Sequence, residues 1–306
     1  MNTSSNIRIE LLNEKLFDEP PLLYPDGINA VEIPFKVTNT QTGDPIPNAK
    51  ITFSVEFIRP NGAETRTEQG IVDQYPGAST KEEIRRRIRS GEIKLIGTIN
   101  TNEASTDAQG VAKVTYVASH IGGNQVEIGQ EKVIATLESS GQVVPFIINV
   151  GFDFLVQIPT IDNGVRIINS KGKHIHKDLA PLFEILGEEI KNSHWPVPMT
   201  ISAGTLTWGG LYPPHKAHRW GAEFDIWTIA TDGSQPYKFT DPQYDRAKTQ
   251  ILVDKLRKYG ATKIFFNDPN INGVKYETGH DDHLHVSFAK NKFKEGLTLH
   301  NLDSND

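Results

Sequence analysis

The sequence contains no cysteine. Disulfide bonds and thiolate metal sites are therefore excluded, and any metal ion must be bound by histidine, aspartate or glutamate. A run of about 18 apolar residues is also absent, so we expect no membrane span. The opening segment, MNTSSNIRIELLNEK, has neither a basic start nor an apolar stretch, and no signal peptide is visible in it.

A concentrated basic stripe is also missing. The net charge is -6, and the basic run RRRIR at residues 85–89 lies just after Glu82 and Glu83, which is typical of a solvated helix face. We therefore expect no nucleic acid partner. A hydrophobic content of 37% and a charged content of 23% are ordinary for a folded soluble protein. The length of 306 residues favours two domains.

The N-terminal half has the pattern of short β-strands. Apolar and polar residues alternate in EIPFKV, KITFSVEF and VPFIINV, and Gly, Pro, Asn and Asp lie between these runs. This spacing predicts an antiparallel β-sandwich over residues 1–155. A helical insertion is predicted near residues 80–90, where Thr80 and Glu83 match a capping box and Ile84 and Ile88 lie one turn apart.

Two turn segments carry a family resemblance in this half. TGDPIPNAKITF and TDAQGVA, within residues 27–150, resemble the bacterial Ig-like repeat of the invasin and intimin type. The resemblance implies an Ig-like sandwich that targets the protein to a wall, a protein partner or a delivery apparatus. The helical insertion between the two segments departs from that pattern.

The pattern changes after about residue 160. A helix is predicted by apolar residues at the spacing i, i+3, i+4, i+7 and i+11: Leu179, Leu182, Phe183, Leu186 and Ile190. A second helix is predicted to begin at Asp241-Pro242 and to end at Gly260, and MTISAGT, KIFF and HLHVSF are predicted strands. We therefore expect an α+β domain with a small, mainly antiparallel sheet over residues 160–306.

Two histidine-rich segments of this domain have the composition of a metal site. In HLHVSF, His283 and His285 alternate with apolar residues, so both imidazoles lie on one strand face. In AEFDIW, Asp225 likewise lies opposite the apolar face. If these strands share a sheet, His285 and Asp225 can bind one cation, and His218 can reach it from the preceding loop. Two imidazoles and one carboxylate leave a fourth position for water, which is the arrangement of a catalytic zinc site.

The remaining histidines are interpreted as structural. His174 and His176 have the same spacing as His283 and His285, but no carboxylate lies at a matching distance in the sequence. His194 precedes prolines in a loop that favours packing, and His120 and His300 are solitary.

The joint pattern of the two segments resembles a zinc peptidase superfamily, which includes lysostaphin-type peptidases, D-Ala-D-Ala carboxypeptidases and the hedgehog signalling domain. Over residues 165–290, the pattern GG-x4-H-x-x-H-x-x-G-x-x-x-D-I-W followed by H-D-D-H-x-H is similar to the penicillin-insensitive murein endopeptidases. Arg219 stands where that family usually has Gln, Glu223 stands where it has Asp, and the family's cysteines are missing. These departures leave the predicted ligands intact and put the substrate preference in doubt.

The resemblance implies a role for each polar residue of the motif. His218, Asp225 and His285 would bind Zn2+, and His280 and His283 would be catalytic beside the zinc-bound water. From the residues alone, the general base is His283, His280 or Asp282, because each can exchange a proton next to the ligand strand. His215 and Asp282 can alternatively orient ligands or contact substrate.

These observations predict a zinc-dependent endopeptidase that cleaves peptide cross-links of bacterial peptidoglycan. Two alternatives remain open: a zinc D,D-carboxypeptidase that trims terminal D-alanine, and a non-catalytic adhesion protein with an inert metal site. The presumed substrate places the activity in the periplasm or the extracellular space. Because no signal peptide is visible, we expect export by a non-classical route or a delivery apparatus.

Overall fold

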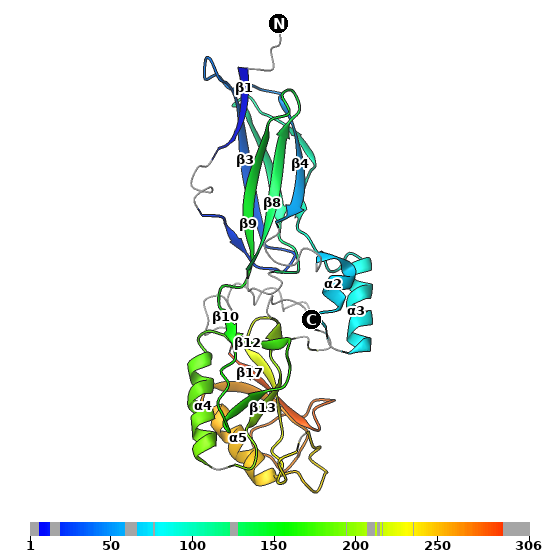
Figure 1. Cartoon of the computed structure of the whole chain (residues 1–306), viewed down its shortest axis with the longest axis vertical. Helices are drawn as coiled ribbons and strands as arrows, with labels where there is room; N and C mark the ends of the chain where they lie inside the picture. The colour runs from blue at the N-terminus through cyan, green and yellow to red at the C-terminus, as the bar shows by residue number, and fades with distance from the viewer. Residues whose placement is uncertain are drawn as a thin grey trace. The chain divides into compact units, whose positions relative to one another are not determined.

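The computed structural model describes residues 6–12, 19–58, 66–75, 77–122, 128–193, 195–206, 212, 215, 217–234 and 236–289. The chain divides into two compact units (Figure 1). The first contains the described residues up to Asp153 together with Tyr212, and the second contains those from Phe154 to Leu206 and from His215 onward. His194, His300 and the Gly209-Gly210 pair of the motif lie outside the described residues. No described helix is long and apolar enough to cross a membrane.

The first unit is a sandwich of two β-sheets. One sheet has the order β1-β3-β7-β5 and is antiparallel throughout, with the bounds Ile7–Leu11, Ala30–Asn39, Val111–Val117 and Thr98–Ile99. The other has the order β2-β9-β8-β4-β6, with the bounds Leu22–Leu23, Val143–Gly151, Ile128–Leu137, Lys50–Phe57 and Glu103–Ser105. Only the β2–β9 pair of the second sheet is parallel among the described strands. The predicted β-sandwich is therefore confirmed.

Alternating residues of both sheets form the core of the sandwich. Ile33, Phe35 and Val37 of β3 are fully buried, and Ile51 and Phe53 of β4 face them from the other sheet in the same apolar cluster. The two phenylalanine rings lie 5.7 Å apart. Every second side chain of these strands therefore lies in the core, as the alternation of apolar and polar residues predicted.

The helical insertion begins earlier than predicted. It consists of α2 (Glu68–Val72) and α3 (Ala78–Arg89). Gly77, at φ 73°, occupies the N-cap position of α3 and makes no side-chain cap. The predicted capping box of Thr80 and Glu83 is therefore wrong, because Thr80 is buried inside the helix and Glu83 instead binds Arg86 and Arg87.

The second unit is built on a five-stranded sheet with the order β11-β13-β15-β17-β16. The strand bounds in that order are Val165–Ile167, Met199–Ala203, Glu223–Trp227, His283–Phe288 and Ala261–Phe265. The β11–β13 pair is parallel and the other pairs are antiparallel. A second, three-stranded antiparallel sheet has the order β10-β12-β14, with the bounds Leu155–Gln157, Gly172–His176 and Thr205–Leu206.

Two helices accompany the five-stranded sheet. The first, α4 (Ala180–Asn192), packs Phe183 against Phe224 of β15 and Phe288 of β17, with ring centroids 5.0 and 6.1 Å apart. The second, α5 (Arg246–Lys258), is joined to α4 by an ion pair between Lys255 and Glu189. The apolar face of the sheet is therefore covered by helix, and the catalytic candidates lie on the opposite face.

The start of α5 differs from the prediction. Asp245, rather than Asp241, is its N-cap, and its side chain accepts a hydrogen bond from the Lys248 backbone N–H. Asp241 instead ends a turn, where its carboxylate accepts from the Lys238 N–H and its carbonyl accepts from the Tyr244 N–H. A proline after an aspartate is compatible with such a turn as well as with a helix start.

Candidate metal and catalytic site

His218 is held by a turn that only glycine can make. Gly221 has φ +87°, and a Cβ at this position would lie 2.2 Å from the backbone nitrogen of His176, which donates to the Gly221 carbonyl. His218 is fully buried, and its Nδ1 lies 3.4 Å from the Gly204 carbonyl oxygen. Because a carbonyl only accepts, this contact places the ring proton on Nδ1 and leaves a lone pair on Nε2.

Asp225 and His285 occupy directly opposite positions in the β15–β17 pair. Oδ1 of Asp225 lies 2.9 Å from Nδ1 of His285 and 3.3 Å from Nε2 of His218, and these two ring nitrogens are 3.2 Å apart. Three atoms that can bind a metal thus form a nearly equilateral triangle. They come from the two segments that the sequence singled out.

With edges of 2.9–3.3 Å, this triangle is slightly smaller than one face of a tetrahedral zinc site. With bonds of about 2.0–2.1 Å to nitrogen and oxygen, two ligand atoms at adjacent corners stand about 3.3–3.4 Å apart. With the His218 proton on Nδ1, Nε2 of His218 and Oδ1 of Asp225 both offer a lone pair, and a shared cation would bind these two atoms together. The residues present therefore fit a zinc ion.

The protonation states in the triangle suit metal binding. Burial lowers the pKa of His218 and so favours its neutral form. Burial acts in the opposite direction on Asp225, but the facing His218 and the hydrogen bonds from His215 and His285 outweigh it and hold the pKa of this carboxyl well below its usual range. A neutral imidazole and an ionised carboxylate are the forms that bind divalent ions.

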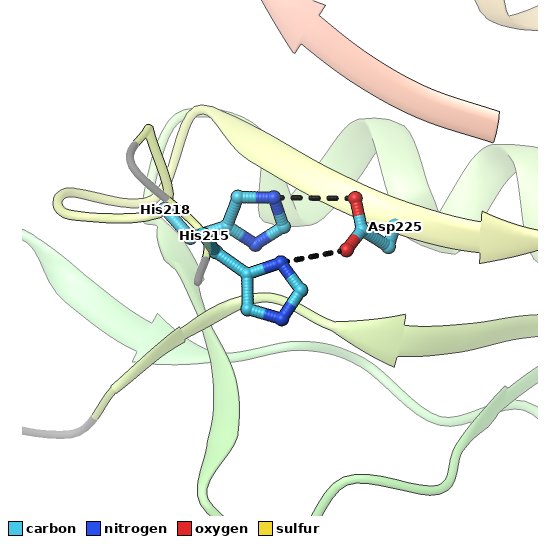
Figure 2. Close-up of side chains that lie close together, drawn as sticks. All are labelled: His215, His218 and Asp225. Atoms are coloured by element: carbon cyan, nitrogen blue, oxygen red, sulfur yellow. Dashed lines mark ion pairs between the residues drawn. The ribbon is translucent and has the colours of Figure 1, made fainter. Parts of the chain in front are cut away.

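His215 joins the cluster on the other side of the carboxylate. Its Nδ1 lies 2.9 Å from Oδ2 of Asp225, so that His215 and His218 point toward different oxygens of one carboxylate (Figure 2). Ligand atoms of His215, His218 and Asp225 all lie within 4.8 Å of one another. His215 is thus placed to orient Asp225 or to act as a further ligand.

The two predicted catalytic histidines lie beside the triangle. Their ring centroids are 4.9 Å apart, and that of His280 is 5.7 Å from that of His285. Nδ1 of His280 lies 3.1 Å from the Glu277 carbonyl oxygen, and Nδ1 of His283 lies 2.8 Å from Oδ1 of Asp282. Because both partners are acceptors, each ring carries its proton on Nδ1 and keeps a lone pair on Nε2. Burial, followed by the neighbouring His283, lowers the pKa of His280.

Two further residues shape the site and were missed from the sequence. Asn267 donates its side-chain N–H to Asp281, accepts from the Glu277 N–H and donates its backbone N–H to the His280 carbonyl. Phe265 places its ring 5.6 and 5.9 Å from the rings of His280 and His285. The alternation in KIFF could have pointed to Phe265, but nothing in the sequence indicates which loop Asn267 holds.

Two further observations concern residues near the cluster. The face of β15 that carries Glu223 and Asp225 is buried, at 3% and 4% exposure, so both faces of this strand are covered. His174 and His176 are buried in β12, where His176 stacks on Phe154 with ring centroids 4.9 Å apart. Neither belongs to the metal-ligand cluster found among the described residues.

Comparisons with known proteins give structural similarity only. No protein-family model and no curated protein matches the chain. Among solved structures, the D0-D1 domain of intimin is 15% identical, with 48% of each chain covered and a TM-score of 0.28. The Yersinia pseudotuberculosis adhesin InvE is 17% identical, with 49% of this chain and 33% of that chain covered and a TM-score of 0.27. The Pseudomonas aeruginosa CupB2 chaperone is 6% identical, with 46% and 54% covered and a TM-score of 0.25.

These similarities are weak. The matched part spans about half of the intimin structure and a third of the adhesin structure. The names agree with the resemblance to intimin-type repeats in the N-terminal half, but TM-scores this low carry no functional argument. The function must therefore be argued from the site.

Proposed function

We propose that the second unit is a zinc-dependent peptidase that cleaves peptide cross-links of peptidoglycan. The observation that carries this proposal is the triangle of His218, Asp225 and His285, with edges of 2.9–3.3 Å, beside two more histidines whose free ring nitrogens are available for proton transfer. A purely structural site needs ligands alone, whereas a hydrolytic site also needs groups that exchange protons.

A bound zinc ion would lower the pKa of its water and polarise the scissile carbonyl. His283 is the proposed general base, because Asp282 holds the proton on Nδ1 and so leaves Nε2 free to accept one. This arrangement makes Asp282 the orienting carboxylate and not the base. His280, also free at Nε2, is placed to accept a proton and to return it to the leaving amine.

The choice of peptidoglycan as substrate is supported by the motif resemblance described above. By the same reasoning, the sandwich of the first unit targets the enzyme to a wall, a protein partner or a delivery apparatus. The enzyme then acts in the periplasm or the extracellular space after export by a non-classical route or a delivery apparatus.

Digestion of purified sacculi tests this proposal. With zinc supplied, the protein is expected to convert cross-linked muropeptide dimers to monomers, as resolved by chromatography. His283→Ala should retain about one zinc per chain and lose most of the activity, by about 10²–10⁴-fold. His218→Ala should lose both. Dimers that stay intact with zinc bound would refute endopeptidase activity.

Two other functions remain as outcomes of the same experiment. A D,D-carboxypeptidase would release D-alanine from monomers and leave dimers untouched. A non-catalytic adhesion protein, which the adhesin names among the similar structures give a reason to retain, would cleave neither substrate. In that case wild type and His283→Ala would behave identically with equal zinc content.

A further inference from the structure

The edge strand β16 places two further side chains on the face that carries the metal-ligand cluster. In the β16–β17 register, Phe265 lies opposite His285 and Lys263 lies opposite Ser287. The Phe265 ring is inclined by only 29° to the His285 ring and stacks against it. Because side chains two apart on a strand share a face, Lys263 lies on the same side of the sheet as the cluster.

The ammonium group of Lys263 leans toward the site. Its Nζ lies 4.7 Å from the centroid of the Phe265 ring, within the range of a cation–π contact. The same ring faces His280 and His285, so one aromatic side chain separates a positive charge from the proposed catalytic groups.

Several basic residues of this unit pair with an acid, and Lys263 is among the described ones that do not. Arg246 is paired with Asp268, Lys248 with Asp245 and Lys255 with Glu189. Among the residues that the structure describes, no carboxylate lies within 4.0 Å of the Lys263 Nζ, which instead contacts the Phe265 ring. Lys263 is a half-buried residue on the site face, and an ammonium that no described acid neutralises is suited to an acidic ligand.

We propose that Lys263, held by Phe265, is a specificity residue that binds a carboxylate of the substrate. The inference rests on the proposed peptidase function and names its substrate class: an acidic peptide with a free carboxylate close to the scissile amide. An ammonium recognises a carboxylate by a charge-assisted hydrogen bond, which a neutral carboxamide in the same place cannot replace at equal strength.

The test compares two forms of one substrate. Cross-linked muropeptide dimers are used either untreated or after carbodiimide coupling to ammonia, which converts their carboxylates to carboxamides. The wild-type zinc enzyme is expected to prefer the untreated dimers by about tenfold in kcat/KM, the size of one charge-assisted hydrogen bond. Lys263→Gln should abolish this preference by raising KM for the untreated form, while zinc content and the kcat for amidated dimers remain unchanged.

Two variants serve as controls. Lys263→Arg keeps the charge and should retain a preference. Lys191→Gln removes a lysine from α4, the helix that packs on the opposite face of the sheet, and should behave as wild type. Phe265→Leu removes the ring that holds the ammonium and should reduce the preference.

The possible results separate the two proposals. If wild type cleaves both forms equally, or if Lys263→Gln keeps the preference, the Lys263 subsite is wrong and the peptidase function stands. If zinc-loaded wild type cleaves neither form, the peptidase function is wrong and the subsite falls with it.

Discussion

Nδ1 of His283 lies 2.8 Å from the carboxylate of its own neighbour, Asp282. The Asp282 carbonyl oxygen lies 3.5 Å from both the backbone nitrogen and the hydroxyl of Thr228. Asp282 thus contacts the residue that follows β15 as well as the His283 imidazole. An orienting carboxylate fixes which ring nitrogen carries the proton, and this determines whether the imidazole can accept one. The role of His283 therefore depends on Asp282.

Replacing Asp282 should affect the rate and not the metal. Asp282→Ala is expected to lower kcat by about 10- to 100-fold, because the His283 proton is no longer confined to Nδ1. Zinc content should remain at the wild-type level. Glu277→Gln, which removes an exposed carboxylate from the same loop, is the matched control. Loss of zinc in Asp282→Ala would show that this carboxylate supports the metal instead.

Replacing His215 should affect the metal. Because His215 binds Oδ2 of Asp225 at 2.9 Å, His215→Ala frees the carboxylate to rotate away from His218 and His285. We expect zinc affinity to fall by about 10- to 100-fold, measured by competition with a chromophoric chelator. His285→Ala, which removes a proposed ligand, should lose far more. Equal losses in both variants would make His215 a ligand in its own right.

Replacing Asn267 should loosen the loop that carries His280. Asn267→Ala removes a donor to Asp281 and an acceptor for the Glu277 amide, both within 3.0 Å. The Glu277 N–H is expected to exchange with solvent faster, by roughly 5- to 150-fold if about 1–3 kcal/mol of local stability is lost. Nuclear magnetic resonance measures this exchange without relying on catalysis. Asn272→Ala on the nearby exposed surface should leave it unchanged.

The first unit contains a buried ion pair whose removal should reduce stability. Glu131 is completely buried and accepts from the Gly97 N–H, the Tyr116 hydroxyl and the Ser119 hydroxyl. The Arg66 guanidinium lies 3.9 Å from the Glu131 carboxylate and donates to the backbone carbonyls of Leu95, Ile121 and Gly122. Burial lowers the pKa of Arg66, while the charge on Glu131 partly opposes this effect.

Glu131→Gln leaves the Arg66 charge buried without its counter-ion. We expect the free energy of unfolding in urea to fall by about 3–5 kcal/mol. The double variant Arg66→Met with Glu131→Gln should lose less than the sum of the single variants, because neither charge then remains alone. Strict additivity would show that the two groups do not interact.

The local pattern of the sequence predicted most elements and the residue types of the site. Strand alternation correctly placed His285 and Asp225 away from the apolar residues of their strands. It could not predict that the two lie directly opposite each other, because register depends on contacts between segments some sixty residues apart. Nor does the alternation in β15 indicate that its polar face is buried, because burial depends on the segments that pack over the strand.

Helix ends were the least predictable feature. Asp241-Pro242 and Asp245 are both acceptable starts for α5. Asp245 is the N-cap, because the Asp241 carboxylate accepts a hydrogen bond from the Lys238 N–H in a turn instead. The roles of Phe265 and Asn267 could not be predicted, because each depends on contacts with residues distant in the sequence.

The hydrogen bond from His176 to the Gly221 carbonyl connects the small β10-β12-β14 sheet to the turn after His218. This sheet therefore supports the turn that holds His218, although it supplies none of the proposed ligands. Substitutions in loops that border the substrate should therefore be tolerated, whereas substitutions in β12 or at Gly221 should disturb the position of His218. A variant library selected for new substrates would do best to leave these positions untouched.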